Sequence, residues 1–352
     1  MTAARVARRF ASVALLVGIA LVAFAAPASA HGIGGTAPTN YDSTVTRITP
    51  ATRGVSAETI DLGNRLRVAN HSNRDLVVLG YDDEPYLRIG PRGVFENRRS
   101  PATYLNRSLT VTTRVPDRAD SKAPPEWDQV SSGQIATWHD HRAHFMGTEA
   151  PPVVKRAPDQ RHVLDRWVVP LRIGSESVDL HGTLSWVPPP SPWPSVVLAV
   201  LVAAAVIGLG RTRHWRSVLA IGTAALVVCA VLHAVGNWAE SSASFGSKSG
   251  ESIYSIVGIA LGVLALVWMW RRGADAAVPF VLVAAVFLLV AGGLADLATL
   301  GHSQVPSSLP AVVDRIVVAL TIGLGVGLAA TAGLRLRVIS PDRHQSSSAQ
   351  PS

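Results

Sequence analysis

Five long apolar runs in the second half of the chain constrain its fold more than any other feature. They lie at 194–210, 217–236, 252–270, 276–297 and 310–334, and a bilayer crossing takes roughly 20 such residues. Only 16% of the 352 residues are charged, against about 25% in ordinary soluble domains. We therefore predict an α-helical membrane domain of five transmembrane helices over 194–334. Disorder, a coiled coil and a wholly soluble enzyme are poor interpretations of such a chain.

Arginines at alternate connections predict the orientation of these helices. They follow the first, third and fifth runs, as Arg211, Arg213, Arg216, Arg271, Arg272, Arg335, Arg337 and Arg343. Connections 237–251 and 298–309 hold one Lys and two Glu between them, so the arginine-rich ends should be cytoplasmic. The tail 335–352 is then cytoplasmic and disordered. The net charge of +8 does not indicate nucleic-acid binding, because the excess lies beside apolar segments.

The first 30 residues read as a signal peptide. Three arginines precede the apolar run 13–25, and Ala28-Ser29-Ala30 is a small-x-small cleavage pattern. An uncleaved membrane anchor is the alternative, although the run is short for a span. Cleavage would make His31 the first residue and place the following domain outside the cell membrane. The positive-inside pattern predicts the same topology.

Residues 31–187 read as an all-β extracytoplasmic domain. This region is nearly neutral, since 31–193 holds 19 Lys and Arg against 18 Asp and Glu. Alternating or β-branched segments, separated by turn residues, predict strands at 44–48, 65–69, 76–79, 109–115, 134–138, 167–173 and 178–187. We expect an antiparallel sandwich of the cupredoxin or immunoglobulin kind. The Pro-rich stretch 188–194 should be a stiff linker to the membrane domain.

The densest group of chemically active side chains follows Trp138. His139 and His141 form a His-x-His pattern, which in a strand would bring both rings to one face, with Asp140 pointing the other way. His144 and Met146 are secondary candidates, because imidazole and thioether together suit copper. Structural or solvated histidines are the alternative. Cys229, the only Cys, lies in an apolar run, so the exported part has no thiolate ligand.

The predicted new N-terminus strengthens the metal hypothesis. An N-terminal His31 offers its α-amine and a ring nitrogen as a chelating pair that does not exist before processing. Together with His139 and His141 it would give an all-nitrogen, roughly square set of donors. That set favours Cu(II), or less well Ni(II).

These features resemble a known family. A signal peptide ending before His31-Gly32, a β-sandwich and a Trp138-His139-x-His141 segment are similar to the N-terminal cupredoxin-like copper domain of the B subunit of particulate methane and ammonia monooxygenases. The resemblance implies copper ligands at His31, His139 and His141. It covers only part of 31–190, and that subunit has two spans and a second β-domain. The chain also resembles, more weakly, bacterial copper-resistance proteins that fuse a periplasmic domain to a multispan transporter.

Polar residues in the apolar half form a second candidate site. His233, Asn237, Asp296, His302 and Asp314 all lie near the predicted outer ends of the helices. Ionisable groups in membrane segments are costly and often functional, which favours a polar vestibule for metal or protons. Interfacial caps and a surface pair of Asp314 with Arg315 are the alternative.

Three functional hypotheses follow from the sequence. The first is a membrane-anchored copper-binding protein for copper acquisition, delivery or tolerance, whose partners are the lipid bilayer, the copper ion, and a copper chaperone or membrane subunit. The second is a component of a copper-dependent monooxygenase or oxidase, and the third is a structural surface domain without metal. No nucleophile–base pair, phosphate loop or paired-carboxylate motif supports another catalytic chemistry.

Overall fold

The computed structural model describes residues 36–108, 114–240 and 245–339. The chain divides into two compact units, and each is described by itself. The β unit comprises Pro38–Pro189 and His302–Val305, and the helical unit comprises Pro190–Gly301 and the described residues from Pro306 onward. The signal peptide, its cleavage site and His31 lie outside the described residues.

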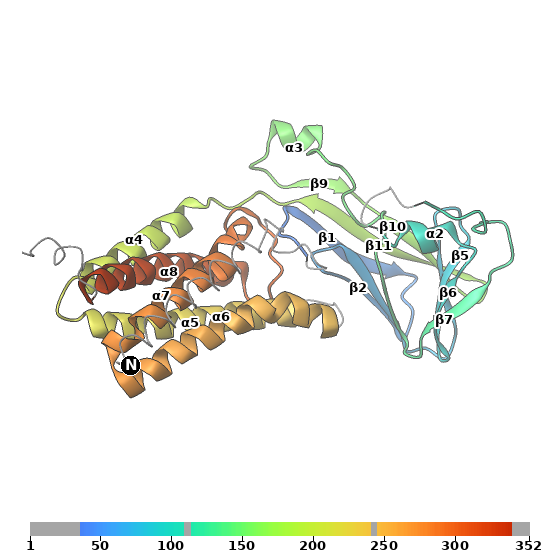
Figure 1. The fold of residues 1–352 in the computed structure, drawn as a ribbon. Helices are drawn as coiled ribbons and strands as arrows, with labels where there is room; N and C mark the ends of the chain where they lie inside the picture. Colours follow the sequence, from blue (N-terminus) through green and yellow to red (C-terminus); the bar gives the residue numbers. More distant parts are fainter. Residues whose placement is uncertain (1–35, 109–113, 241–244, 340–352) are drawn as a thin grey trace, which may run out of the picture. The chain divides into compact units, whose positions relative to one another are not determined.

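The β unit contains two antiparallel sheets (Figure 1). The larger has the order β1-β11-β10-β4-β5-β6-β7, with β9 paired to β11, and the smaller has the order β2-β3-β8. The strands are β1 (Tyr41–Thr49), β2 (Val55–Ile60), β3 (Arg65–Asn70), β4 (Leu76–Leu79), β5 (Pro85–Gly90), β6 (Gly93–Asn97), β7 (Trp127–Ser131), β8 (Ile135–Trp138), β9 (His162–Asp165), β10 (Val168–Ile173) and β11 (Glu176–Trp186). Two short helices, α2 (Pro101–Leu105) and α3 (Pro152–Arg156), interrupt them.

Both sheets contribute side chains to one apolar core. Strand β3 alternates Leu66 and Val68, which are fully buried, with the more exposed Arg65 and Arg67. Such alternation places every second residue on one face of the sheet. Strands of the larger sheet add buried residues such as Ile89 to the same core, and burying each large apolar side chain is worth about 1.5–3 kcal/mol. Burial of alternate residues therefore fixes the register of these strands.

The structure confirms an antiparallel β region in this part of the chain. Six of the seven predicted strands correspond to β1, β3, β4, β8, β10 and β11, and the seventh, 109–115, falls largely outside the described residues. Strands β2, β5, β6, β7 and β9 were not predicted. Nor were α2 and α3, each of which has a proline in its first turn, where a missing N–H costs least.

Four residues from the second half of the chain, His302–Val305, complete the β unit. The main chains of Thr39 and Gln304 exchange two hydrogen bonds, of 3.0 and 2.9 Å. The backbone N–H of Ser303 donates to the side-chain oxygen of Asn40 at 2.8 Å. His302 therefore belongs to a different unit from the other predicted polar residues of the apolar half.

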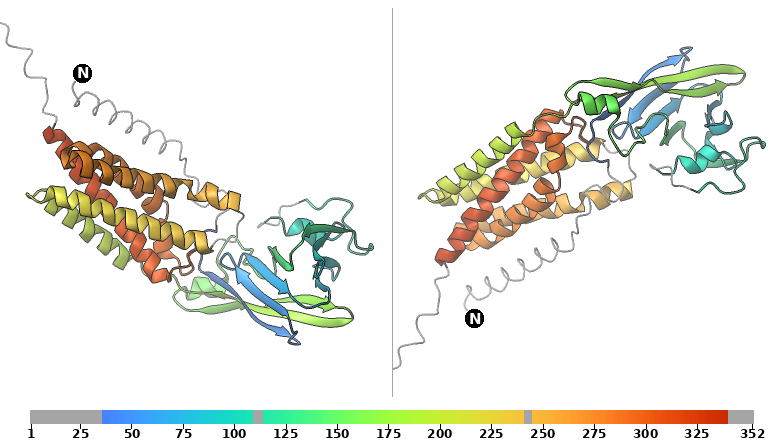
Figure 2. Two further views of the ribbon diagram at one scale, coloured as in Figure 1. Left: turned by 90° about the horizontal axis from the view of Figure 1, so that it is seen from below. Right: turned by 90° about the horizontal axis from the view of Figure 1, so that it is seen from above.

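The helical unit contains five helices long and apolar enough to cross a membrane, as predicted. They are α4 (Trp193–Gly210), α5 (Trp215–Glu240), α6 (Phe245–Arg272), α7 (Ala274–Leu289) and α8 (Ala311–Ile339), and Figure 2 shows them running roughly side by side. Helix α7 continues into a π-helix, η1 (Val290–Leu294), which is followed by a 3₁₀ helix, η2 (Leu297–Gly301). Large apolar side chains such as Leu201 and Ile221 remain exposed. An apolar surface of this kind is typical of a multi-pass membrane protein.

Glycines allow α8 to approach its neighbours closely. A Cβ at Gly323 would lie 2.6 Å from the carbonyl oxygen of Ala199 on α4, and one at Gly327 would lie 2.6 Å from the Cβ of Val206. Without side chains at these two positions the helix backbones pack directly against each other, as small residues permit in membrane proteins.

Candidate functional site

The His-x-His segment begins where strand β8 ends, so the prediction that it lies within a strand was wrong. Trp138 is the last residue of β8, and His139 and Asp140 follow it without regular secondary structure. A turn begins at His141. The relative positions of the two histidine rings therefore come from this turn and not from the two-residue period of a strand.

Asp140 is the physical reason for the turn. Its buried carboxylate accepts hydrogen bonds from the indole Nε1 of Trp138 at 3.0 Å and from the backbone N–H of Arg142 at 3.1 Å. Two guanidinium nitrogens of Arg142, Nε and Nη2, donate to it at 2.8 Å each. A side chain that bonds to the backbone two residues ahead competes with the sheet ladder and turns the chain. Asp140 thus has a structural role and is fully engaged by its neighbours.

Three imidazoles lie together after this turn. The ring centroids of His139 and His141 are 5.0 Å apart, and those of His139 and His144 are 5.1 Å apart, both in edge-to-face arrangements. His139 is buried, and the other two are half-buried. The structure therefore brings His144 beside His139, together with the His-x-His pair. Met146 is half-buried in the same segment.

Backbone carbonyls determine which nitrogen of two of these rings carries hydrogen. The Nδ1 of His139 lies 2.5 Å from the carbonyl oxygen of Asn64, and the Nε2 of His141 lies 2.9 Å from that of Ser108. A carbonyl can only accept, so each of these nitrogens donates. In the neutral rings, the Nε2 of His139 and the Nδ1 of His141 each keep a lone pair. The Nε2 of His139 is buried and has no hydrogen-bond partner among the described residues.

The surroundings of His139 and His144 favour the neutral form of these two rings. Burial lowers the pKa of His139, and the neighbouring ring of His141 adds to this effect, partly offset by the Asn64 carbonyl. Burial lowers the pKa of His144 to about 4, and the two neighbouring imidazoles contribute to the same shift. A neutral imidazole with a free lone pair is the form that binds metal ions.

Two neighbouring segments hold the cluster in place. Asn64 follows a tight turn in which Asp61, Leu62 and Gly63 all have positive φ values, and a Cβ at Gly63 would lie 2.6 Å from that of Ser43. The phenol oxygen of Tyr81 accepts the backbone N–H of His141 at 3.1 Å.

The same phenol donates to the side-chain oxygen of Asn106, which precedes Ser108 by two residues. Sequence reasoning missed Asn64, Tyr81, Asn106 and Ser108. Two of them act through main-chain carbonyls, which every residue has, so no sequence signal marks them.

The described residues alone do not make a complete metal site. No group of three or more His, Cys, Asp or Glu side chains within 36–108, 114–240 and 245–339 is arranged to hold a metal ion. His31, the predicted chelating residue, lies outside these ranges. The hypothesis of a copper site at this cluster names His31 as a further ligand.

In the helical unit, four of the five predicted polar residues meet. His233 on α5 contacts both Asp296, which follows η1, and Asp314 in the first turn of α8. Asn237, one turn beyond His233, contacts the same imidazole. The fifth residue, His302, belongs to the β unit.

The alternative of Asp314 in a surface pair with Arg315 does not fit the burial of Asp314. Asp314 is only 1% exposed and bonds to His233. The guanidinium of Arg315 donates to the carbonyl of Thr299 on η2 at 3.3 Å.

Comparison with known proteins adds no relative: no family model, no curated protein and no solved structure matches the chain. The resemblance to the monooxygenase B-subunit domain therefore stays a prediction.

Proposed function

We propose that this protein is a membrane-anchored, extracytoplasmic copper-binding protein that serves copper acquisition, delivery or tolerance. His31, His139 and His141 are the proposed ligands, with His144 and Met146 as secondary ones. The helical unit anchors the β unit to the cell membrane, with the arginine-rich connections and the C-terminus on the cytoplasmic side. A copper chaperone or a membrane subunit is the expected partner.

The buried, unpaired Nε2 of His139 carries this proposal. A histidine kept only for packing would be expected to satisfy both nitrogens, because a buried polar atom without a partner costs about 1–3 kcal/mol. Here the Asn64 carbonyl fixes the proton on Nδ1 and leaves Nε2 as a bare acceptor. Metal-binding histidines typically have this arrangement, with one nitrogen donating to a backbone carbonyl and the other facing the metal.

The available donors favour copper over hard cations. Asp140, the nearest carboxylate in the sequence, is engaged by Trp138 and Arg142, so the free donors are imidazole nitrogens. An α-amine and a ring nitrogen from a processed His31 would extend this to an all-nitrogen set, which suits Cu(II). The proposed cupredoxin-like character of the β unit rests on the sequence resemblance and on its antiparallel sheets.

Copper titration of the full-length, natively processed protein tests the proposal. We expect one tightly bound Cu(II) per chain, and strong weakening when a single alanine is inserted ahead of His31, because the insertion removes the chelating amine next to the ring. His71→Gln is the matched control, since the His71 side chain is exposed and its ring bonds only Gln134 among the described residues. Binding that survives both the insertion and His139→Gln would overturn the proposal.

A further inference from the structure

The polar residues of the helical unit form a second, independent site. His233, Asp296 and Asp314 come from three different elements and are 7%, 7% and 1% exposed. Ionisable groups buried among apolar helices are costly and usually mark a functional position. The arrangement of their hydrogen bonds indicates which ligand they bind.

Both ring nitrogens of His233 face carboxylates. Nδ1 lies 3.0 Å from Oδ1 of Asp314, and Nε2 lies 3.1 Å from Oδ2 of Asp296. An ionised carboxylate only accepts hydrogen bonds, so two such contacts require hydrogen on both nitrogens. These three side chains are then an imidazolium between two carboxylates, with a charge of −1 among themselves, and Arg315 beside Asp314 adds a positive charge.

Asn237 reveals a second way to place the protons. Its Nδ2 lies 3.1 Å from the same Nε2 of His233, while its Oδ1 is buried and has no partner within the part of the chain that the structure describes. An amide nitrogen facing a protonated Nε2 would set donor against donor. The contact is favourable when Nε2 is bare and Asp296 holds the proton, and the amide of Asn237 and the O–H of Asp296 then compete for the one lone pair of Nε2. Turning the amide over restores the imidazolium state and satisfies Oδ1.

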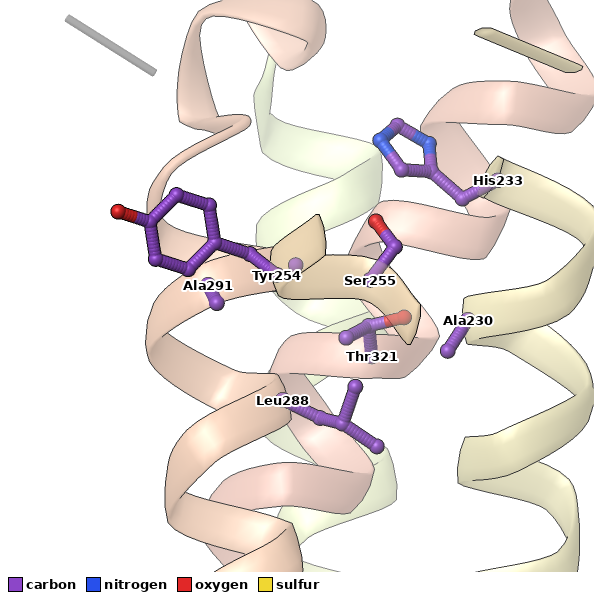
Figure 3. A pocket seen from close by; sticks show the side chains of 8 residues that line it. Ala230, His233, Tyr254, Ser255, Leu288, Ala291 and Thr321 are labelled. Atoms are coloured by element: carbon purple, nitrogen blue, oxygen red, sulfur yellow. The ribbon is translucent and has the colours of Figure 1, made fainter. Parts of the chain in front are cut away.

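Among the described residues, the other side chains that line the cavity beside His233 are uncharged, and Arg315, the residue after Asp314, adds a positive charge that acts on that carboxylate. A small cavity beside the imidazole is lined by Ser255 of α6 and Thr321 of α8 among others, and Figure 3 shows the Ser255 hydroxyl and the ring facing it. The Tyr254 side chain of α6 also lines this cavity. Arg315 of α8 bonds to the carbonyl of Thr299 on η2.

The backbone beside the site is unusual. Gly292, which lines the cavity, belongs to the π-helix Val290–Leu294, and Asp296 follows two residues after this helix ends. Single turns of π-helix interrupt the regular hydrogen-bond ladder and occur frequently at functional sites. Asp296, one of the two carboxylates, is therefore placed beside His233 directly after this irregular turn.

We propose that His233, Asp296 and Asp314 form a proton-binding site through which the helical unit takes up and releases protons. One proton moves between Nε2 of His233 and Oδ2 of Asp296, and Asn237 reorients with it. A second proton, delivered by water through the cavity, takes these three side chains from a charge of −1 among themselves to neutral. A metal ion is the less suitable ligand, because both ring nitrogens are already engaged by carboxylates.

Infrared titration of the full-length protein in lipid vesicles tests this site, with the carboxylic-acid C=O band followed from about pH 4 to pH 9, a range that covers ordinary Asp and His titration. We expect a titrating buried-carboxyl band that is lost in Asp296→Asn and altered in His233→Gln. Asp275→Asn is the matched control, because Asp275 is an exposed carboxylate paired with Arg216, and it should leave that band intact.

A measurement on the unmodified protein keeps the test independent of variant folding. A hydrophobic carbodiimide, which reacts with protonated carboxyl groups in apolar surroundings, should label Asp296 or Asp314 in a pH-dependent way, as mapped by peptide mass spectrometry. A static ion pair would give no pH-dependent band and no adduct, and that result would overturn the proposal. Copper binding has no bearing on either readout.

Discussion

Replacing Asp140 with asparagine tests the claim that one buried carboxylate shapes the histidine cluster. Oδ2 accepts from the Trp138 indole and from Nη2 of Arg142, and Oδ1 accepts from the backbone N–H and Nε of Arg142. An asparagine in either orientation would place its NH₂ group against two of these donors. The substitution therefore removes two hydrogen bonds and leaves a guanidinium without its counter-charge.

The expected cost follows from the burial of this pair. Breaking a buried ion pair by removing one partner costs about 3–5 kcal/mol. The Arg142 side chain is 20% exposed and that of Asp140 is 0% exposed, so some solvent screening remains and we expect about 3 kcal/mol. At 1.36 kcal/mol per tenfold change, this is roughly a hundredfold increase in local opening.

Hydrogen exchange measures this opening. The full-length protein is kept in detergent micelles, and exchange is read by mass spectrometry on peptides that span β8 and the histidine segment. Glu149→Gln is the control, because Glu149 pairs with Lys155 at the surface, with side chains 78% and 54% exposed, and such pairs contribute about 0–1 kcal/mol. The double variant Asp140→Asn/Arg142→Gln should open less readily than the single variant, since no uncompensated charge remains. Exchange in Asp140→Asn that matches the Glu149→Gln control would refute the reasoning.

Three further changes test other parts of the structure. Gly323→Ala should destabilise the helical unit by about 1–3 kcal/mol through overpacking. Gly333→Ala, whose new Cβ meets nothing within 4 Å, should leave the stability unchanged or raise it by up to about 1 kcal/mol, because Ala favours a helix more than Gly does. Equal melting temperatures of the two variants in micelles would contradict the close approach of α4 and α8. Tyr81→Phe removes hydrogen bonds to the His141 backbone and the Asn106 side chain and should cost about 1–3 kcal/mol, measured by hydrogen exchange at the histidine segment. Burial raises the pKa of Glu96 above 4.5, with Arg107 opposing the shift, so the folded state holds this proton more tightly. Its contribution to stability is present below pH 4.5 and is lost as the pH rises through the folded pKa. Glu96→Gln should remove that loss. If the stability of this variant, measured by denaturation, falls with rising pH as in the wild type, Glu96 is not the cause.

The regular elements could be predicted where burial follows a simple period. The five apolar runs predicted the helices α4–α8, and alternation in β3 predicted its inward face. Strand β5 was missed because its buried residues do not alternate, and β7 because its last three residues are exposed. The π-helix was missed because the run 276–295 is apolar throughout, so the one-residue shift in side-chain period that a π-turn causes leaves no signal in the sequence.

The geometry of the candidate site could be predicted from the sequence only in part. The His-x-His pattern drew attention to His139 and His141, but it predicted a strand where Asp140 makes a turn. The groups that fix the ring nitrogens are the carbonyls of Asn64 and Ser108, which lie 75 and 33 residues away along the chain. Their positions depend on tertiary folding, including the positive-φ turn before Asn64.

The central claim is tested most directly by the copper affinity of the natively processed, full-length protein. The affinity is compared between the wild type and His139→Gln. Competition with a Cu(II) chelator of known affinity measures both. We predict one Cu(II) per chain in the wild type. Removing a residue that only supports a metal ligand typically weakens metal binding by roughly 10- to 100-fold, so His139→Gln should weaken copper affinity by at least that factor. Equal affinity in the two proteins, or no stoichiometric copper in the wild type, would contradict the assignment of the unpaired Nε2 of His139 as a metal ligand.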